Sequence, residues 1–503
     1  MRTVLGIDIG TTSVKAILVS ADGRIVDEAN VPHDLLSPKA GWAEENAADW
    51  WHGAVAAVGE LKKRNATLFA AVECVGVTGM VPAIVMLDEN GEPIRNTIQQ
   101  NDARPVAQIE EIAAAVDQEE LYRKTGGYTN QQHVLPRMLW VKQNEPEVFA
   151  KLRFVLGSYD YIVYRLTGVL SVEMNWAVES GLFDIRKKVW LTDQMEQFGF
   201  DPAWFPTVNA SMHIVGRVSE TAARLTGIAA GVPVIAGSAA HVASTLSAGI
   251  INEGDLLIKF GGAGDILYCT ERIVTSKKLF FDYHIVPDRY LINGCMAASG
   301  SLVKWYLGDI LDNYGGAALK ELDEAAAKLP PASDGLIILP YFLGEKTPIF
   351  DPEARGMMFG LTLSHTKAHI FRACLEAVIY GFKHHIDVIE ELGYRPAHIM
   401  ATNGGSRSKF WCQIAADVLD REITAYPSHP GSAMGVAFLA GMASGMFTSW
   451  EQINLFLTER RTYTPDPEAA AIYKKSYQIY RDLYRQTKES CRAVADLYRR
   501  EER

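Results

Sequence analysis

The sequence predicts an α/β protein built from two similar halves. Short apolar segments alternate with amphipathic ones along the chain, which is typical of strands alternating with helices. A strand–turn–strand pattern at the N-terminus recurs at residues 256–268. No low-complexity segment or long linker interrupts the 503 residues, and domains of about 150 residues would number two to four in such a chain.

The first half opens with a predicted hairpin. Val4 to Ile9 and Val14 to Val19 are short apolar strands, and Gly10-Thr11-Thr12 forms the turn between them. From Asp49 to Arg64 the apolar residues recur at helical spacing, so an amphipathic helix is expected there.

The second half repeats this opening. Leu256 to Phe260 is apolar, residues 261–264 form a small-residue turn, and Ile266 to Tyr268 resumes an apolar strand. A boundary at residue 248 would divide the chain into two nearly equal domains, 1–248 and 249–503. At the C-terminus the tyrosines at 473, 477, 480 and 484 lie on one face of a predicted helix, and we interpret this stripe as packing surface.

Composition excludes several classes of protein. The 49 basic and 60 acidic residues give a net charge of −11, which argues against non-specific binding to nucleic acid or to anionic membranes. No apolar run is long enough for a transmembrane helix, and the start of the chain does not resemble a signal peptide. The six cysteines are scattered without a CxxC pair, so we expect a reducing, cytoplasmic location without disulfides or a zinc site.

The first hairpin turn is a candidate phosphate site. Gly10, Thr11 and Thr12 offer backbone N–H groups and hydroxyls to an anion, with Lys15 close behind. Asp8, at the end of the strand, could hold Mg²⁺ through water. The alternative is an ordinary hairpin with an exposed acid.

Two further segments carry chemistry. An apolar strand at 399–403 runs into Gly404-Gly405 and then into a helix that begins near Lys409; paired glycines let a flat ring lie against the backbone. The loop at 340–356 is long and punctuated by proline and glycine, which is typical of a functional segment, and its aromatic residues argue against disorder.

Together these segments resemble the FGGY family of carbohydrate kinases, most closely its xylulokinase branch. The resemblance extends over nearly the whole chain in the family's order. It rests on Asp8 to Lys15, Gly41-Trp42-Ala43-Glu44 with Asp49-Trp50-Trp51, Gly76 to Gly79, Asp88 with Gly91, Asn101 to Arg104, Asp160-Tyr161, Leu166-Thr167-Gly168, Gly344 to Pro348, Arg372-Ala373 with Glu376, and Gly404-Gly405 with Trp411, Gln413 and Asp417.

The resemblance implies two actin-like (ribonuclease-H-like) domains around a cleft, in an enzyme that transfers the γ-phosphoryl group of Mg·ATP to a sugar or polyol hydroxyl. Sugar would bind mainly to the first domain and ATP to the second. By carry-over, Asp8 attends the magnesium, and the phosphates meet Gly10, Thr11, Thr12, Lys15, Gly261, Gly262 and Ala263. Gly404, Gly405 and Lys409 flank the adenine. A homodimer is a habit of the family.

The sequence departs from the family at the general base. An aspartate accepts the proton of the attacking hydroxyl in the family, but its place falls on Ala240, and a methyl group accepts no proton. Losing a general base commonly costs about 10² to 10⁴ in rate. Three interpretations follow. The chain is an engineered Asp→Ala variant of an active kinase, which the intact binding loops favour. Otherwise it is a natural kinase-like protein with little catalysis, or His241 acts as the substitute base. We favour His241 as a substrate contact or a packed histidine over the last reading.

The sugar and phosphate segments depart as well. Met80-Val81-Pro82 stands where typical xylulokinases carry Gln-Met-His, so a different ketose or a linear polyol is expected to compete with xylulose. Asp102 and Arg104 are candidate polar contacts, with a loop ion pair as the alternative; Asn175 and Trp176 are candidates for the pocket border. Gly262-Ala263 replaces the Thr-Ser of many relatives. Asp265 is expected to be a solvated acid, with a magnesium contact as the alternative.

Two rival functions are retained. One is a non-catalytic sugar or nucleotide sensor that uses the same cleft. The other is an actin-like ATPase that forms filaments, against which stand Asp102, Arg104 and the loop at 340–356, all features of a small-substrate site.

Overall fold

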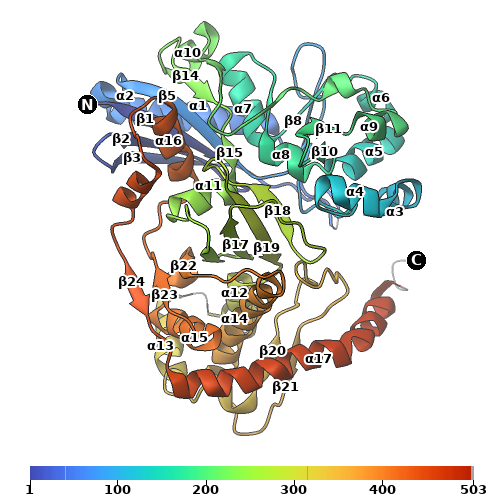
Figure 1. The fold of residues 1–503 in the computed structure, drawn as a ribbon, viewed down its shortest axis with the longest axis vertical. Helices are drawn as coiled ribbons and strands as arrows, with labels where there is room; N and C mark the ends of the chain where they lie inside the picture. Colours follow the sequence, from blue (N-terminus) through green and yellow to red (C-terminus); the bar gives the residue numbers. More distant parts are fainter. Residues whose placement is uncertain (40, 314, 500–503) are drawn as a thin grey trace.

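The computed structural model describes residues 1–39, 41–313 and 315–499. In these residues two mixed sheets form two lobes that follow one another along the long axis of the molecule (Figure 1). Helices pack on both sheets, which confirms the predicted α/β class. No helix in the described ranges is both long and apolar enough to cross a membrane.

The sheet of the upper lobe has the order β13-β14-β5-β1-β2-β3, with β15 added beside β5. Its strands are β1 (Thr3–Ile9), β2 (Ser13–Ser20), β3 (Arg24–Pro32), β5 (Val72–Gly79), β13 (Ile214–Arg217), β14 (Pro233–Ile235) and β15 (Ser238–Ala239). β1 and β2 pair antiparallel, as predicted, and β5 lies parallel to β1. The predicted helix is α1 (Ala47–Arg64), whose first turn is capped by the Asn46 side chain.

The sheet of the lower lobe has the order β18-β19-β17-β16-β22-β23-β24. Its strands are β16 (Asp255–Phe260), β17 (Gly264–Thr270), β18 (Phe280–Tyr283), β19 (Tyr290–Met296), β22 (His398–Thr402), β23 (Ile423–Ala425) and β24 (Arg461–Tyr463). β16 pairs antiparallel with β17 and parallel with β22, the same two kinds of neighbour that β1 has. The repeat read from the sequence is therefore a repeat of topology.

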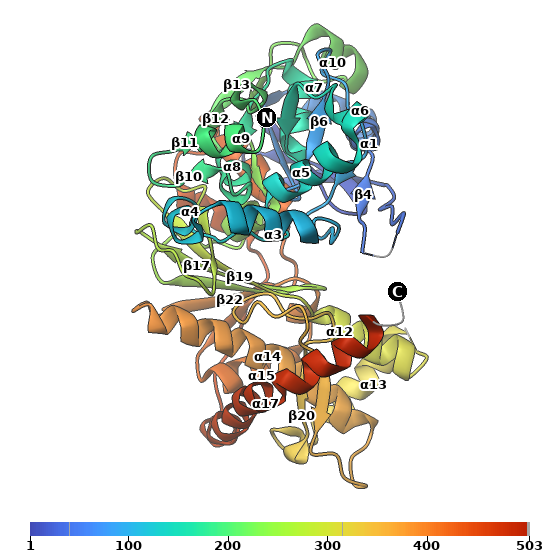
Figure 2. The ribbon, with the colours of Figure 1, turned by 90° about the vertical axis from the view of Figure 1, so that its right-hand side faces the viewer.

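Other helices cover these sheets and join them. In the upper lobe they include α3 (Val106–Ala115), α4 (Gln118–Thr125), α5 (Val134–Asn144), α7 (Ser158–Thr167), α8 (Met174–Glu179), α10 (Glu220–Thr226) and α11 (Ala240–Ser247). In the lower lobe they include α12 (Gly300–Trp305), α13 (Gly316–Ala326), α14 (Lys367–Glu391), α15 (Lys409–Leu419) and α17 (Pro467–Arg499). Seen from the side, α3 and α4 lie above β17 and β19, where the lobes meet (Figure 2).

The tyrosine stripe of α17 is packing surface, as predicted. Tyr473 and Tyr480 are almost fully buried against the core of the lower lobe. The hydroxyls of Tyr480 and Tyr341 form a hydrogen bond of 3.0 Å, and Tyr484 donates to Asp351 at 2.7 Å. These bonds fasten the last helix to the loop at 340–356.

One late helix crosses back to the first lobe. α16 (Ser432–Ala443) packs on β1 and β5 within the core of the upper lobe. The boundary at residue 248 stays a prediction, and the upper lobe draws part of its core from beyond it. The approach is close because Gly6 and Gly76 present no side chain: a Cβ at either would lie 2.3 Å from a carbonyl oxygen, that of Ala433 or Val436.

Gly76→Ala is therefore expected to lower the free energy of unfolding by about 1–3 kcal/mol, because the added methyl must push α16 off the sheet. Urea denaturation measures the change. Gly59→Ala in α1 is the control, since nothing lies within 4 Å of its added Cβ and alanine favours the helix by roughly 0.5–1 kcal/mol. Equal stability of Gly76→Ala and the original chain would contradict the packing argument.

Candidate active site

A pocket of about 280 Å³ lies where the two lobes face each other. From the upper lobe it is lined by residues that include Val81, Gln100, His133, Glu179 and His241. From the lower lobe it is lined by residues that include Ala263, Asp265, Asn293, Cys295 and Lys346. Of the predicted substrate contacts, Val81 and His241 thus line the pocket, and the buried Met80 directly precedes Val81.

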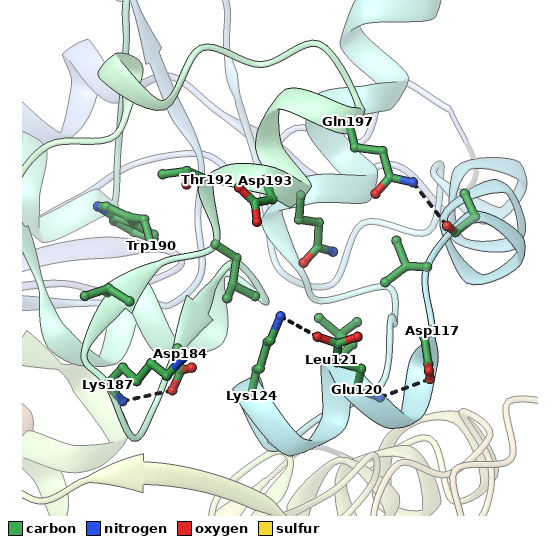
Figure 3. Close-up of a pocket in the computed structure, with 15 residues that line it drawn as sticks. Asp117, Glu120, Leu121, Lys124, Asp184, Lys187, Trp190, Thr192, Asp193 and Gln197 are labelled. Carbon is green, nitrogen blue, oxygen red and sulfur yellow. Dashed lines mark hydrogen bonds and ion pairs between the residues drawn. The ribbon is translucent and has the colours of Figure 1, made fainter.

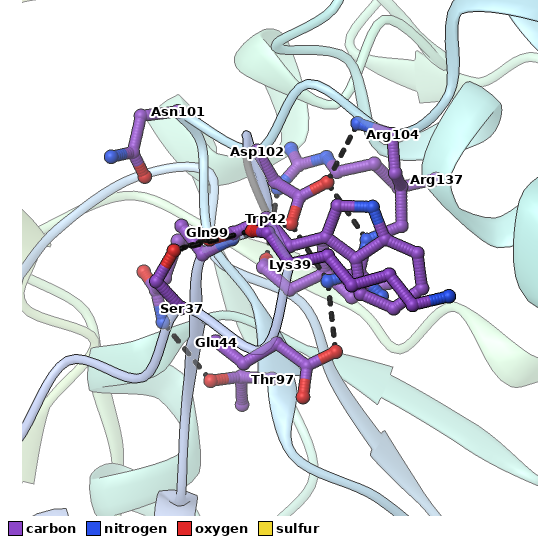
Figure 4. Close-up of polar contacts among 12 residues, drawn as sticks. Ser37, Lys39, Trp42, Glu44, Thr97, Gln99, Asn101, Asp102, Arg104 and Arg137 are labelled. Atoms are coloured by element: carbon purple, nitrogen blue, oxygen red, sulfur yellow. Dashed lines mark hydrogen bonds and ion pairs between the residues drawn. The ribbon is translucent and has the colours of Figure 1, made fainter. Parts of the chain in front are cut away.

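Asp102 and Arg104 lie behind this wall. Arg104 donates from Nε and Nη2 to the two Asp102 oxygens at 2.8 and 2.7 Å, and its Nη2 also meets Glu44 at 2.8 Å. The guanidinium stacks on Trp42, with its central carbon 3.9 Å from the ring centre (Figure 4). Neither residue lines the pocket, so the structure forms the loop ion pair that the sequence left as the alternative. This pair fixes the segment that carries Gln100.

Position 240 begins α11 directly after β15. Ser238 and Ala239 of β15 pair with Thr78 and Gly79 at the end of β5, next to Met80. The Ala240 methyl is partly exposed. The helix start therefore brings residues 240 and 241 to the edge of the sheet from which Val81 reaches the pocket.

The His241 imidazole is held by two acids. Its Nε2 lies 3.1 Å from Asp282 Oδ2 and 3.5 Å from Glu179 Oε1. Burial acts to lower the pKa of His241, but the two carboxylates outweigh it and raise the pKa to about 9. A base must be unprotonated to accept a proton, so this geometry weighs against His241 as the substitute base.

We expect NMR of histidine-labelled protein to show one resonance titrating near pH 9, absent from His241→Gln. Because the folded-state pKa exceeds the unfolded value, the charged imidazole stabilises the fold fully below pH 6.5, and this contribution is lost as the pH rises toward 9. A His241 resonance that titrates at or below pH 6.5 would contradict the ion pairing.

The first predicted phosphate turn is open. Thr11 and Thr12 are exposed, and Gly10 N–H donates to the Ser13 carbonyl at 3.0 Å. The half-buried Asp8 accepts a hydrogen bond of 2.5 Å from Ser432 at the start of α16. Burial raises the pKa of Asp8, against the pull of that bond. Lys15, opposite Asp8 on β2, forms an ion pair of 2.9 Å with Glu28.

The second predicted phosphate turn, at 261–264, is held by hydrogen bonds from residues 299–301. The Gly261 and Gly262 carbonyls accept bonds from the N–H groups of residues 299–301, while Gly262 and Ala263 remain exposed. The expectation that Asp265 is a solvated acid is wrong. It pairs across the hairpin with Lys259 at 2.8 Å, and although burial acts to raise the pKa of Asp265, Lys259 keeps it below the usual value.

The predicted adenine segment is a 3₁₀ turn, Gly404–Arg407, at the end of β22. Gly404 is exposed, and a Cβ there would meet nothing within 4 Å. Gly405 is different, since its Cβ would lie 2.5 Å from Phe260 and 2.6 Å from Trp411. Lys409 is exposed at the first position of α15, which Ser408 caps. The turn thus offers an open backbone surface beside a helix start.

The loop at 340–356 is ordered by bonds to β19. Thr347 accepts from the Cys295 N–H at 2.6 Å, and Glu345 accepts from the Ala297 N–H at 2.7 Å. These bonds direct Lys346 into the pocket.

Several residues of the candidate site escaped the sequence analysis. Glu179, Asn293 and Lys346 line the pocket. Asp282 and Lys259 do not line it, but they pair with His241 and Asp265, which do. A signal existed for two of them: Lys259 and Asp282 are charged residues inside otherwise apolar stretches, Leu256 to Phe260 and Phe280 to Tyr283. Buried charges are uncommon unless paired, so each called for a partner from elsewhere in the chain. Asn175 and Trp176 are fully buried, and the Asn175 amide bonds to the backbone of Tyr283 in β18.

A second cavity, of about 410 Å³, lies on the upper lobe between α4 and residues 184–197 (Figure 3). Some of its charged groups have local partners: Lys124 pairs with Glu120 at 2.7 Å, and Asp184 accepts from the Lys187 N–H at 2.9 Å. It contains none of the predicted site residues.

Comparison with known proteins gives a consistent picture. Models of the N-terminal and C-terminal domains of the FGGY family of carbohydrate kinases match residues 3–247 and 275–444. The chain is 30% identical to a xylulose kinase of Bacillus subtilis, over 97% of this chain and 98% of that protein. A gluconokinase of the same species is 26% identical over 99% and 98%. The crystal structure of a xylulose kinase from Rhodospirillum rubrum superposes with a TM-score of 0.91 at 41% identity, covering 98% of this chain and all of that one.

Proposed function

The chain belongs to the FGGY family of carbohydrate kinases, with that family's two actin-like domains, and we propose that it phosphorylates a small ketose or polyol from Mg·ATP. The observation that carries this proposal is the pocket between the lobes, which combines polar side chains with the end of the second predicted phosphate turn at Ala263. Closure of the two lobes over a substrate there would exclude water and limit the transfer of phosphate to water.

On the nucleotide side we assign the phosphates to the turns at Gly10 to Thr12 and at 261–263. Their exposed backbone and hydroxyl groups favour an anion. The adenine is assigned to the turn Gly404-Gly405, whose open surface is at Gly404, with Lys409 beside it. Lys15 forms an ion pair with Glu28, so its ammonium group must break this pair before it can contact a phosphate.

Asp8 is assigned to the magnesium. Its carboxylate offers the oxygen ligand that Mg²⁺ prefers, and it lies one residue from the end of β1 before the phosphate turn. When bound, the ion neutralises charge on the phosphates. In this chain the Ser432 hydroxyl holds the Asp8 carboxylate by a hydrogen bond.

We propose that the chain is impaired at Ala240. The loops around the cleft retain the polar groups that binding needs, and the missing feature is a carboxylate at the start of α11. A kinase with an Asp→Ala change at this position explains that combination better than loss of function throughout the site. The free cysteines at all six positions suit a reducing cytoplasm, where we place the enzyme.

The experiment is ATP-dependent phosphorylation of a panel of four- to six-carbon ketoses and polyols, xylulose among them, by this chain and by Ala240→Asp. Turnover by the aspartate variant alone establishes the kinase and names its substrate. Binding of ATP without turnover by either chain would favour the sensor. Nucleotide-dependent sedimentation as a polymer would favour the filament-forming ATPase and overturn the proposal.

A further inference from the structure

We propose that Lys259 is a further catalytic residue, whose ammonium group contacts the terminal phosphoryl group of ATP and neutralises its charge during transfer. This inference rests on the proposed function, since it concerns the nucleotide of the same site. It adds a charged side chain that neither phosphate turn contains, and it gives the neighbouring Asp265 the role of holding that side chain in place.

Lys259 occupies in the lower lobe the place that Asp8 occupies in the upper lobe. Each residue stands two positions before the first glycine of a predicted phosphate turn, Gly10 or Gly261. Each is the half-buried residue of an otherwise buried strand, β1 or β16, which has an antiparallel hairpin partner on one side and a parallel strand on the other. Because the lobes repeat one topology around the cleft, the two side chains would face one nucleotide from opposite sides.

The charges at these two places are opposite. Asp8 lies opposite Lys15 across the first hairpin, and Lys259 lies opposite Asp265 across the second. A carboxylate suits Mg²⁺, whereas an ammonium group suits the phosphate oxygens directly. The repeat therefore offers the metal a ligand from one lobe and the phosphates a cation from the other.

The Lys259 ammonium group is anchored beside the site. Its Nζ lies 2.8 Å from Asp265 Oδ2, and the Lys259 side chain is only 12% exposed. An ammonium group has three N–H donors, so the contact with Asp265 leaves it able to donate to a phosphate oxygen. Asp265 lines the interlobe pocket, and Gly261 of the phosphate turn follows Lys259 by two residues. The cation is thus held between a wall of the pocket and the turn assigned to the phosphates.

The charge of Lys259 acts on groups of three other segments around the cleft. Burial raises the pKa of Asp8 at the end of β1, and Lys259 acts to lower it. Burial lowers the pKa of His429, in the segment before α16, to about 3, and Lys259 acts in the same direction. Lys259 also acts to lower the pKa of His241 at the start of α11. Since a Coulomb interaction weakens with distance, the ammonium group lies near all three segments.

The chemistry of the step needs such a cation. The P–O bond to ADP breaks, and ADP keeps the electron pair. A P–O bond to the sugar hydroxyl forms, and the hydroxyl proton goes to the base that Ala240→Asp supplies. Charge meanwhile spreads over the three remaining oxygens of the transferred group. Lys259 gives up no proton in this step, because it acts as a fixed positive charge.

The alternative is an ion pair that only stabilises the hairpin of β16 and β17. In that case removal of the Lys259 charge would lower stability without distinguishing one nucleotide from another. A direct contact with the terminal phosphoryl group instead makes the loss specific to nucleotides that carry this group. The two interpretations therefore differ in a binding measurement that needs no turnover.

The test is calorimetric binding of Mg·ADP and of Mg·AMP-PNP, an ATP analogue that resists hydrolysis, to the full chain. Lys259→Met is expected to weaken AMP-PNP binding by about tenfold to a hundredfold and ADP binding by less than about threefold. Lys259→Arg keeps the charge and should hold AMP-PNP affinity within about threefold of the original. In the Ala240→Asp chain, Lys259→Met should lower kcat by about 10²–10³.

Two controls separate the phosphate contact from the ion pair. Lys259→Met leaves Asp265 without its cation, so the double variant with Asp265→Asn is measured as well, and it should show the same selective loss. Lys278→Met is the matched control, since it breaks an exposed ion pair of the same 2.8 Å length, with Glu391, and should leave both affinities unchanged. Thermal unfolding shows whether each variant is folded.

The outcomes are distinct. Equal losses for ADP and AMP-PNP in Lys259→Met, or no loss for either, overturn this inference while the proposed function stands. A selective loss that Asp265→Asn reverses would assign the effect to the unpaired carboxylate of Asp265, and it would overturn the inference too. If neither nucleotide binds to the original chain, the proposed function fails and the inference with it.

Discussion

Ala240→Asp is expected to raise the rate of phosphoryl transfer by about 10²–10⁴ with the preferred sugar, because it supplies the missing proton acceptor. The new carboxylate would stand at the first position of α11, where the helix dipole favours a negative charge. It would also adjoin His241 at the pocket wall. In phosphoryl transfer such a residue orients the attacking hydroxyl and accepts its proton.

The measurement is kcat for the two chains in a coupled ADP-release assay, with sugar-independent ATP hydrolysis subtracted. Ala240→Asn is the control, since it matches aspartate in size but accepts no proton at neutral pH. We expect it to remain as slow as the present chain. Equal rates for the asparagine and aspartate variants would mean that position 240 acts by filling space, and the assignment of the base would be wrong.

Glu376→Ala is expected to lower the free energy of unfolding by about 3–5 kcal/mol, because it leaves the buried guanidinium of Arg372 without its carboxylate partner. Arg372 and Glu376 pair one turn apart on α14 at 2.8 Å, and both side chains are almost fully buried. Glu376 also accepts from the Tyr473 hydroxyl at 2.7 Å and from the Ser333 hydroxyl at 2.8 Å. The carboxylate therefore joins α14, α17 and the chain before β20 (Ile337–Leu339).

Urea denaturation measures this loss, and two variants calibrate it. Tyr473→Phe removes the hydroxyl's bond to Glu376 and the bond that it accepts from Arg372, and should cost about 1–3 kcal/mol. Glu324→Ala breaks the exposed pair with Lys320, 3.9 Å apart, and should change stability by less than about 0.5 kcal/mol. If Glu376→Ala were no more harmful than Glu324→Ala, the network would not hold α17 to the lobe.

The elements that the sequence predicts correctly are those with a local cause. The hairpins β1–β2 and β16–β17 follow from short apolar runs around small-residue turns, and α1 and α17 follow from helical spacing. The repeat that relates the two halves can be seen in the sequence because both hairpins have this local pattern. The site was partly predictable too, since Val81, Ala263 and His241 line the pocket.

Other parts of the site depend on partners that no local pattern specifies. From the sequence, Asp102 and Arg104 are equally consistent with substrate contacts and with an ion pair. The structure shows the ion pair, and Glu44 and Trp42 also contact Arg104 in it. From the sequence, Asp265 is interpreted as a solvated acid. In the fold, Lys259 lies opposite Asp265 on the neighbouring strand and forms an ion pair with it. In each case the neighbour that neutralises the charge comes from another strand or loop.

The sequence by itself determined the α/β class, the repeated hairpins, the family and the absence of a proton acceptor at residue 240. These properties depend on residue type and short-range spacing, which a linear chain displays directly. Only the tertiary structure decided that α16 returns to the upper lobe and that Glu179, His241, Asp282 and Asn293 meet. Those meetings depend on how two sheets and their helices pack, because four elements distant in the chain must converge before these side chains come within reach of one another.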